Sequence, residues 1–457
     1  MKKIVVTMCV VAMCATAWAE DHVMAATKTA AVRDVPASLS LNLTEAQDYA
    51  VSTNRSLRNA ELAVQKAYAQ RWQTIAAMLP QVDMSWAYAS MMGYKMVMEM
   101  GTGMTDPATG EEIKKAMEIP MNDNGTLGVT ASVGINGQAI VGALLNNIAI
   151  DMQKLSLQQS EDNLRANVKS SYASVLVLQD VVKLLDASLR NIENLAVMTQ
   201  RSVEVGAAEQ IAADQIMVRV NTLKTNINTN KRSTQLAINA LKVLLNVPVE
   251  TELILTSSLE DLLSAEAVLQ LLGKEFVLEN NLNYQTLAKN VELAKTNVHM
   301  AGWAYGPTVA VGYQYSEKSY FGKAAGMNMT PPNALSVSVS MPLWSSGKRA
   351  AGVVEKKIAL EEARNTFAET TDNLGIQNQQ LRYNLQNGYE TYLNEKDNMD
   401  VTQRVFDNTT NKFNLGAASN LDLVNASNDL IAAQSSYVQA VLTLVNAQVE
   451  LEKFLNL

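Results

Sequence analysis

The residues of this sequence best suited to chemistry are a group of methionines. Six of them fall within fourteen residues, and a thioether sulfur is a soft donor that suits Cu(I). Methionine is also an adaptable packing residue, and three of the six recur at period two, as on one face of a strand that extends beyond a sheet. We therefore expect packing here and keep a metal site as the alternative. The six are Met91, Met92, Met96, Met98, Met100 and Met104.

Other reactive side chains are scarce. The two cysteines, Cys9 and Cys14, lie near the amino terminus, and the two histidines, His22 and His299, are far apart. We expect no disulfide, no His/Cys metal site and no cofactor. The sequence has no G-x-S-x-G motif, no phosphate loop and no H-E-x-x-H motif, so we expect neither a catalytic residue nor an enzyme.

The amino terminus reads as a secretory signal. Lys2 and Lys3 precede an apolar stretch from Ile4 to Ala15, and Ala17-Trp18-Ala19 is an A-x-A cleavage site. We assign residues 1–19 to this signal and residues 20–40 to an amino-terminal tail. The alternative, a retained anchor, is disfavoured because the apolar run is too short to span a bilayer.

Charge and hydropathy further limit the class of protein to which this chain can belong. Without Lys2 and Lys3, 35 of the 37 basic residues remain against 45 acidic ones, and the formal net charge moves from −8 to −10. This balance disfavours nucleic acid as a partner, because binding to phosphates needs cationic contacts. No later run of about 18 apolar residues occurs, so we expect no membrane helix. Transmembrane strands alternate apolar and polar residues and escape such a scan.

The chain reads as two copies of one unit. Matching residues recur at a spacing of 210 in the carboxyl-terminal part of each copy, and at a spacing of 227 nearer its start. The difference of 17 predicts a longer loop in the first copy, between Tyr88 and Leu127. We expect repeats over residues 41–246 and 276–457, joined by a connector over 247–275. The matched pairs include Gly137/Gly347, Gly206/Gly416, Asn246/Asn456, Asn54/Asn281 and Pro80/Pro307.

Each copy is predicted to fold as helix, β-hairpin, very long helix and helix. Residues 143–205 contain neither glycine nor proline, and residues 353–415 contain no proline. The first stretch could form a helix of about 95 Å, and a helix of that length needs partners along it, as in a coiled coil. The last helix of each copy has a heptad pattern. Its positions are Ile216, Val220, Leu223, Ile227, Asn230, Thr234, Ala237, Leu241 and Leu244, and the same residue numbers plus 210. Taken alone, these helices would also suit a soluble bundle.

Four segments alternate apolar with small or polar residues, which predicts strands with one apolar face. They are 82–88, 127–133, 309–315 and 335–343. Strands of about this length can cross a membrane at a tilt, with the polar face toward a water-filled lumen. Trp86, Trp303 and Trp344 lie in or beside them, where an aromatic girdle would be. A small soluble sheet half-covered by helices is the alternative.

Four strands are too few for a closed outer-membrane barrel, which has about eight or more. Lipid also excludes open sheet edges. If the strands lie in a membrane, the chain must therefore associate with copies of itself to close its sheet.

Four segments of the chain occur in an order that is specific when taken together: LNLTEAQDYAVSTNRSLRNAELAVQKA (41–67), MLPQVDMSWAY (78–88), VSVSMPLWSSGKRAAG (337–352) and KFNLGAASNLDLVNASNDLIAAQSSYVQA (412–440). On these segments the sequence resembles the TolC family of outer membrane efflux proteins, and the resemblance covers nearly all of residues 41–457. It implies an α+β membrane protein: a homotrimer whose outer-membrane β-barrel has four strands from each chain and continues as a coiled-coil α-helical barrel in the periplasm. It also implies contact with outer-membrane lipid, and docking on a periplasmic membrane-fusion adaptor and an inner-membrane pump. Such a channel is a passive conduit of an efflux or secretion system.

The turns between the last two helices of each copy are the candidate docking sites. These tip turns contain Val205-Gly206 and Leu415-Gly416, and glycine there suits a helix end with positive φ. The next helix begins near Asp422, which either caps that helix or, as the resemblance implies, lines a constriction near the threefold axis. Asn425 lies one turn further on. In the first copy Ala212 stands at the equivalent of Asp422, with Asp214 nearby.

A second functional hypothesis remains at this stage. A periplasmic coiled-coil adaptor or scaffold would bind partners and transport nothing. Such a protein needs no lipid-facing strands, so the two amphipathic hairpins favour the channel.

Overall fold

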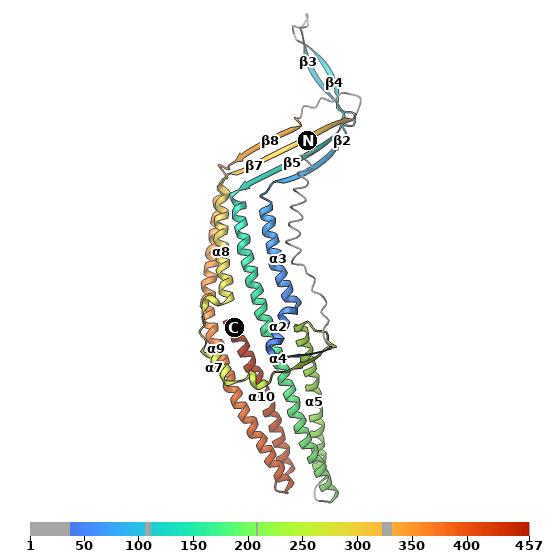
Figure 1. Cartoon of the computed structure of the whole chain (residues 1–457), viewed down its shortest axis with the longest axis vertical. Helices are drawn as coiled ribbons and strands as arrows, with labels where there is room; N and C mark the ends of the chain where they lie inside the picture. Colours follow the sequence, from blue (N-terminus) through green and yellow to red (C-terminus); the bar gives the residue numbers. More distant parts are fainter. Residues whose placement is uncertain (1–36, 106–109, 111, 207–208, 322–330, 457) are drawn as a thin grey trace. The chain divides into compact units, whose positions relative to one another are not determined.

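The computed structural model describes residues 37–456, apart from 106–109, 111, 207–208 and 322–330 (Figure 1). The predicted signal and most of the predicted tail lie outside these residues. The strands are β1 (Ser38–Leu41), β2 (Gln81–Ala89), β3 (Lys95–Thr105), β4 (Glu112–Pro120), β5 (Asp123–Asn136), β6 (Glu252–Leu255), β7 (Thr308–Phe321) and β8 (Asn333–Ser340). The helices are α2 (Leu43–Thr53), α3 (Arg55–Ala76), α4 (Gly137–Glu204), α5 (Gln210–Leu245), α6 (Leu259–Leu262), α7 (Ala265–Gly273), α8 (Leu282–Gly302), α9 (Lys348–Asn414) and α10 (Asn420–Leu455).

The chain divides into two compact units. One comprises, among the described residues, 37–67, 150–291 and 363–456, and it is almost entirely helical. The other comprises residues 68–149 and 292–362 and contains the main sheet. The divisions fall inside helices α3, α4, α8 and α9, so each of these helices contributes to both units.

The four predicted strands form one antiparallel sheet, in the order β2-β5-β7-β8. Its register mostly pairs apolar residues with apolar ones and polar with polar, with exceptions toward one end of the sheet such as Leu127 opposite Glu317. Trp86 pairs with Leu127, Val311 with Val337, and Ser132 with Gly312 on the other face. The sequence prediction of strands with one apolar face is thus confirmed.

The longer loop predicted in the first copy contains its own hairpin. Strands β3 and β4 pair with each other in a separate two-stranded sheet. The prediction that Met96, Met98 and Met100 lie along a strand is confirmed, because all three belong to β3.

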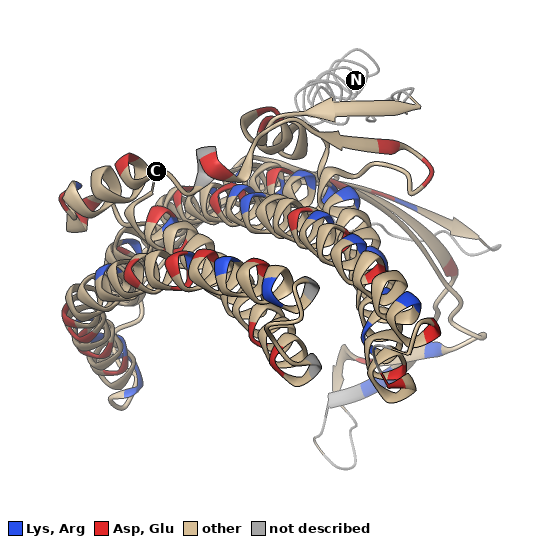
Figure 2. Ribbon diagram, turned by 90° about the horizontal axis from the view of Figure 1, so that it is seen from below, with Lys and Arg blue, Asp and Glu red and all other residues tan. Residues whose placement is uncertain are grey.

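Both very long helices are present. Helix α4 has 68 residues and α9 has 67, close to the predicted 143–205 and 353–415. Charged residues of both signs are interspersed along the helices (Figure 2), and exposed pairs such as Lys224–Glu193, at 2.9 Å, link neighbouring helices. Surface pairs of this kind contribute little stability, so apolar packing must hold the helices together.

That packing follows the predicted heptads. In α5 and α10 most of the predicted positions are buried, and together with residues of α4 and α9 they form two apolar clusters. Within the described part of the chain one segment, Leu421–Leu455, is long and apolar enough by composition to cross a membrane. A core helix passes the same test, and α10 buries Leu423, Leu430, Leu444 and Leu451 in these clusters.

The end of the predicted tail and the predicted connector are joined, which the sequence analysis did not predict. Strand β1 pairs in parallel with β6, and Ser38 lies opposite Glu252. Beside them the fully buried Tyr172 of α4 donates a hydrogen bond to Leu41 O at 2.9 Å and accepts one from Ser257 N at 3.1 Å.

The first helix of the first copy is interrupted, so the prediction of one helix there was wrong. Helix α2 ends at Thr53 and α3 begins at Arg55. Asn54, between them, donates its amide to Leu244 O at 2.9 Å, and Asn246 donates its amide back to Thr53 O at 3.1 Å. These two reciprocal bonds tie the break to the end of α5. We call this arrangement an asparagine clasp.

A second clasp lies in the other half of the chain. Asn281 donates to Phe454 O at 3.1 Å, and Asn456 donates to Asn280 O. The amide oxygens of the two central asparagines cap the following helices: Asn54 accepts from Ser56 N and Leu57 N, and Asn281 accepts from Asn283 N and Tyr284 N. Asn246 and Asn456 both have left-handed backbone, with φ of 53° and 55°, which asparagine tolerates better than most residues.

We expect the clasps to set the stability of the helical unit. Asn54→Ala or Asn281→Ala removes a donor and a helix cap and leaves a carbonyl oxygen without its partner, at a cost of roughly 1–3 kcal/mol. The midpoint of thermal loss of the helical circular dichroism signal should fall in both variants and further in the double variant. Asn221→Ala, at an exposed position of α5, should leave the midpoint unchanged. A clasp variant as stable as the wild type would contradict this role.

Candidate functional site

The apolar face of the main sheet is open. On the two edge strands the apolar side chains are more than half exposed, and on the central strand β7 Val309, Val311 and Tyr313 are 40%, 36% and 42% exposed. Single exposed apolar residues are common, but a contiguous apolar face of this extent marks a surface made for lipid or a partner. The edge residues are Val82 52%, Met84 75%, Trp86 67%, Leu335 73%, Val337 66% and Val339 68%.

The opposite face is small and polar. Ser85 lies across from Gly128, and Gly312 across from Ser336. A side-chain carbon added at either glycine would lie 3.0 Å from the hydroxyl oxygen of the facing serine. Because these glycines have no side chain, the hydroxyl groups of Ser85 and Ser336 fit against the neighbouring strands. The result is a face of small polar groups that suits contact with water.

The sheet ends in two unpaired edges. Within the described residues β2 and β8 each have one neighbouring strand, β5 and β7 respectively. Their outer N–H and C=O groups need water or a further strand. An open apolar face bounded by two such edges is stable in lipid only if other strands continue the sheet.

The three tryptophans lie in or beside the strands, as predicted. Trp86 is in β2, Trp344 follows β8, and Trp303 begins a short 3-10 helix (Trp303–Tyr305) before β7. All three are at least half exposed. The ring of Trp303 lies directly over Gly137, where an added side-chain carbon would come within 2.1 Å of it. This close approach accounts for glycine at the start of α4.

Both tip turns have the predicted backbone. Gly206 and Gly416 have φ of 74° and 75°, and each ends a very long helix. The N–H groups donate to Val203 O at 3.0 Å and Phe413 O at 2.9 Å. The preceding residues are strongly exposed, Val205 at 78% and Leu415 at 84%. Each turn thus presents an apolar side chain to the outside, although Ala207 beside the first turn lies outside the described residues.

Asp422 caps helix α10. Its carboxylate accepts hydrogen bonds from Ser419 N at 2.9 Å and Ser419 Oγ at 2.7 Å, and Ser419 Oγ accepts from Asp422 N at 3.1 Å. This is a capping box. The hydrogen bonds from Ser419, the side-chain one foremost, hold the pKa of Asp422 below its ordinary value. The capping hypothesis is therefore confirmed for the single chain, and the constriction stays a prediction.

The other two predicted gate residues differ from Asp422. Asn425 is exposed one turn further along α10, and Asp214 is exposed on α5, where it accepts a hydrogen bond from Gln210 at 2.9 Å. The helix α5 begins after Glu209, which makes no side-chain cap. The two tips are therefore built differently.

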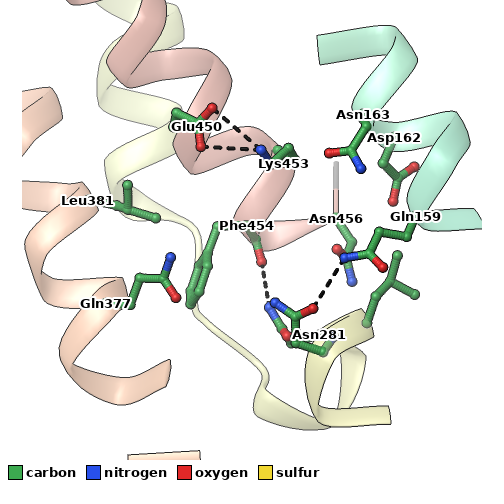
Figure 3. A pocket seen from close by; sticks show the side chains of 12 residues that line it. Gln159, Asp162, Asn163, Asn281, Gln377, Leu381, Glu450, Lys453, Phe454 and Asn456 are labelled. Atoms are coloured by element: carbon green, nitrogen blue, oxygen red, sulfur yellow. Dashed lines mark hydrogen bonds and ion pairs between the residues drawn. The ribbon is translucent and has the colours of Figure 1, made fainter. Parts of the chain in front are cut away.

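A polar cavity of about 250 Å³ lies in the helical unit, beside the second clasp (Figure 3). Its lining includes Asp162, Asn163, Asn281, Lys453 and Asn456. One oxygen of Asp162 is buried without a hydrogen-bond partner in the described part of the chain. Burial foremost, and then the charge of Glu161, raise the pKa of Asp162, although Arg165 opposes the shift.

No local pattern in the sequence predicts this cavity, because its lining residues come from four helices. Among the residues the structure describes, no group of three His, Cys, Asp or Glu side chains could hold a metal ion.

Comparison with known proteins supports the sequence resemblance. The model of the outer membrane efflux protein family matches residues 275–457. The probable efflux pump outer membrane protein TtgC of Pseudomonas putida is 21% identical over 375 residues, which are 76% of this chain and 74% of that protein. The outer membrane efflux protein BepC of Brucella suis is 24% identical over 337 residues, 71% of each chain.

Solved structures share the fold. CusC, whose structures concern folding and transmembrane channel formation, aligns with a TM-score of 0.69 at 16% identity, over 90% of this chain and 91% of its own. The outer membrane protein VceC of Vibrio cholerae aligns with a TM-score of 0.68 at 15% identity, over 90% and 95%.

Proposed function

We propose that this chain, a member of the outer membrane efflux protein family, is the passive exit channel of an efflux or secretion system in the outer membrane. The observation that carries the proposal is the four-stranded sheet with an exposed apolar face, a polar face and two free edges. A scaffold protein in the periplasm has no use for such a face, since water would be its only neighbour. The sheet, with its exposed apolar face and its polar face, supports a conduit rather than an enzyme.

Closure of the sheet requires further copies. Three chains with four strands each would give a barrel of twelve strands, within the range that spans outer membranes. The apolar face would contact lipid, and the serine and glycine face would line the lumen. Trp86, Trp303 and Trp344 would lie at the membrane surfaces, where aromatic residues are favoured.

We expect three chains per particle. Analytical ultracentrifugation of the detergent-purified protein should give a protein mass of three copies, because four strands leave two edges that only neighbours can pair. A stable monomer with a closed barrel would refute the proposal. Separation of a heavy membrane fraction after expression with residues 1–19 intact should place the protein in the outer membrane.

We further propose that the chain arose by duplication. Helices α5 and α10 each have 36 residues, and both of their ends are 210 residues apart. Helices α3 and α8 begin 227 residues apart, at Arg55 and Leu282. The two clasps use residues at the same two spacings. A shared ancestor for the repeats 41–246 and 276–457 explains these coincidences together.

The tip turns are the proposed docking surface for a periplasmic adaptor, which would connect the channel to an inner-membrane pump. Val205 and Leu415 supply exposed apolar contacts, and the positive φ of the following glycines holds the turns in shape. The two turns share the glycine conformation and the exposed apolar residue before it, so an adaptor could contact both.

Export should depend on the shape of the second turn. Gly416→Pro cannot adopt positive φ and removes the N–H that bonds to Phe413 O, so export in cells should be lost while the amount of protein in the membrane stays normal. Gly416→Asn is the matched control, since asparagine tolerates positive φ, and it should keep most of the export. Wild-type export in the proline variant would exclude this turn as the docking surface.

The same tip is the proposed periplasmic gate. Three copies of Asp422 around the narrow end would form an anionic ring, with Asn425 and Asp214 as secondary contributors. Two effects on the pKa of Asp422 then compete. The cap lowers it, as in the single chain, whereas neighbouring carboxylates raise it. A negative ring would attract cations and repel anions.

We expect Asp422→Asn to reduce cation preference in planar bilayers, seen as a smaller reversal potential under a salt gradient. Asp214→Asn is the control and should change it less, because its position does not match Asp422 in the other repeat. The pH dependence adds a second test. A capping carboxylate with a lowered pKa keeps its charge and its stabilisation above the ordinary value near 4 and loses both as the pH falls through the lowered value. Carboxylates that lie close together in a ring raise one another's pKa values, so the ring loses charge while the pH is still above 4. An unchanged reversal potential for Asp422→Asn would mean that Asp422 only caps helix α10 and does not line the constriction.

A further inference from the structure

The hairpin of β3 and β4 has two unlike faces. Its antiparallel register places Met98 directly opposite Met117. Met96 and Met100 lie two residues to either side of Met98, so they project to the same face. Lys95, Glu99 and Glu118 lie on the other face, where Lys95 Nζ and Glu118 Oε2 form an ion pair at 2.8 Å. One side of the hairpin thus carries an ion pair, and the other carries four methionines together with Lys115.

The spacing brings these sulfur atoms within reach of one another. Residues directly opposite in an antiparallel pair have Cβ atoms about 4.5–5.5 Å apart, and diagonal neighbours about 7–8 Å apart. Methionine has three rotatable bonds beyond the backbone, so the side chains of Met96, Met98 and Met117 can turn their sulfur atoms toward one point. Met117 is distant from Met96 and Met98 in the sequence. The period-two pattern of methionines therefore did not include it.

Strand stability does not account for this choice of residues. Strands favour β-branched and aromatic side chains, and packing inside this chain covers the methionines only in part: Met96 is partly buried, and the others are exposed. Met98 is 41% exposed, Met117 45% and Met100 49%. Val97, on the charged side of the same strand, shows that a β-branched residue fits this hairpin. Packing was the favoured interpretation from the sequence, and the exposure of the thioether face weakens it.

We propose that Met96, Met98 and Met117 form a binding site for a soft monovalent cation, Cu(I) or Ag(I). Three neutral thioethers are poor ligands for hard cations such as Ca²⁺ or Mg²⁺, which select oxygen. Lys115 lies opposite Met100 on the same face, and its positive charge disfavours a cation at that end. The site is therefore centred on the Met98–Met117 pair. This proposal does not depend on the chain being an export channel.

The site should differ from one made of histidine or carboxylates in its response to pH. Those ligands must lose a proton before they bind, so their affinity falls on acidification. A thioether has no proton to lose, and its affinity for Ag(I) should be the same at pH 5 and pH 8.

The test is titration of the purified full-length protein in detergent with silver nitrate, in buffer without chloride, followed by calorimetry. We expect one Ag(I) per chain at this site. Met98→Leu/Met117→Leu keeps the apolar volume and should weaken binding at least tenfold. Met198→Leu/Met217→Leu, at exposed positions of α4 and α5, is the matched control and should bind like the wild type. Calcium nitrate should give no heat.

A variant that is expected to bind Ag(I) more tightly distinguishes loss of the site from misfolding, because a misfolded protein would not gain affinity. Ile119 lies opposite Met96 on the thioether face, so Ile119→Met adds a fourth sulfur and should tighten Ag(I) binding. Competition for Cu(I) with a chelator under reducing conditions should rank the variants in the same order. Equal Ag(I) binding by the wild type and Met98→Leu/Met117→Leu, or no tightening in Ile119→Met, would overturn the proposal and leave the face as a packing surface.

Discussion

Within the described part of the chain the outer edges of β2 and β8 have no neighbouring strand, and this constrains how the sheet can exist in a membrane. A strand edge in lipid leaves N–H and C=O groups without partners, and each costs several kcal/mol. The sheet order β2-β5-β7-β8 places the two halves of the chain side by side through β5 and β7, so one chain supplies a continuous four-stranded segment with an edge at either end. Such a segment has no stable state alone in a bilayer, and the proposed association of copies follows from its backbone.

Capping at the ends cannot by itself stabilise a helix as long as α4, which has 68 residues. Its stability must come from packing along its length. Helices α5 and α10 provide this by burying heptad positions in two clusters shared with α4 and α9. Packing along a stripe fixes which faces of the helices meet. The asparagine clasps complement it, because their reciprocal bonds require one longitudinal register between a helix break and a helix end.

Local patterns in the sequence predicted most of the fold. Period-two alternation located the four strands, the absence of proline located α4 and α9, and heptads located the buried stripe of α5 and α10. Contacts that join distant segments were beyond such patterns. The β1–β6 pair, the clasp at Asn54 and the cavity beside Asp162 each join residues more than a hundred positions apart. Asn54 and Asn281 were visible only as a matched pair in the repeat, with no sign of what they bind.

The two tips share the backbone conformation of their glycines but differ at the start of the following helix. The glycines Gly206 and Gly416 adopt the same φ, so the turns agree. The next helices begin differently: Ser419 and Asp422 form a capping box on α10, whereas α5 follows Glu209 without a side-chain cap. A carboxylate that serves as a cap is held in one orientation by Ser419, and an oriented charge is what an ordered ring around an axis requires. Capping and gating are therefore compatible roles for Asp422, and the cap prepares the geometry that a gate would use.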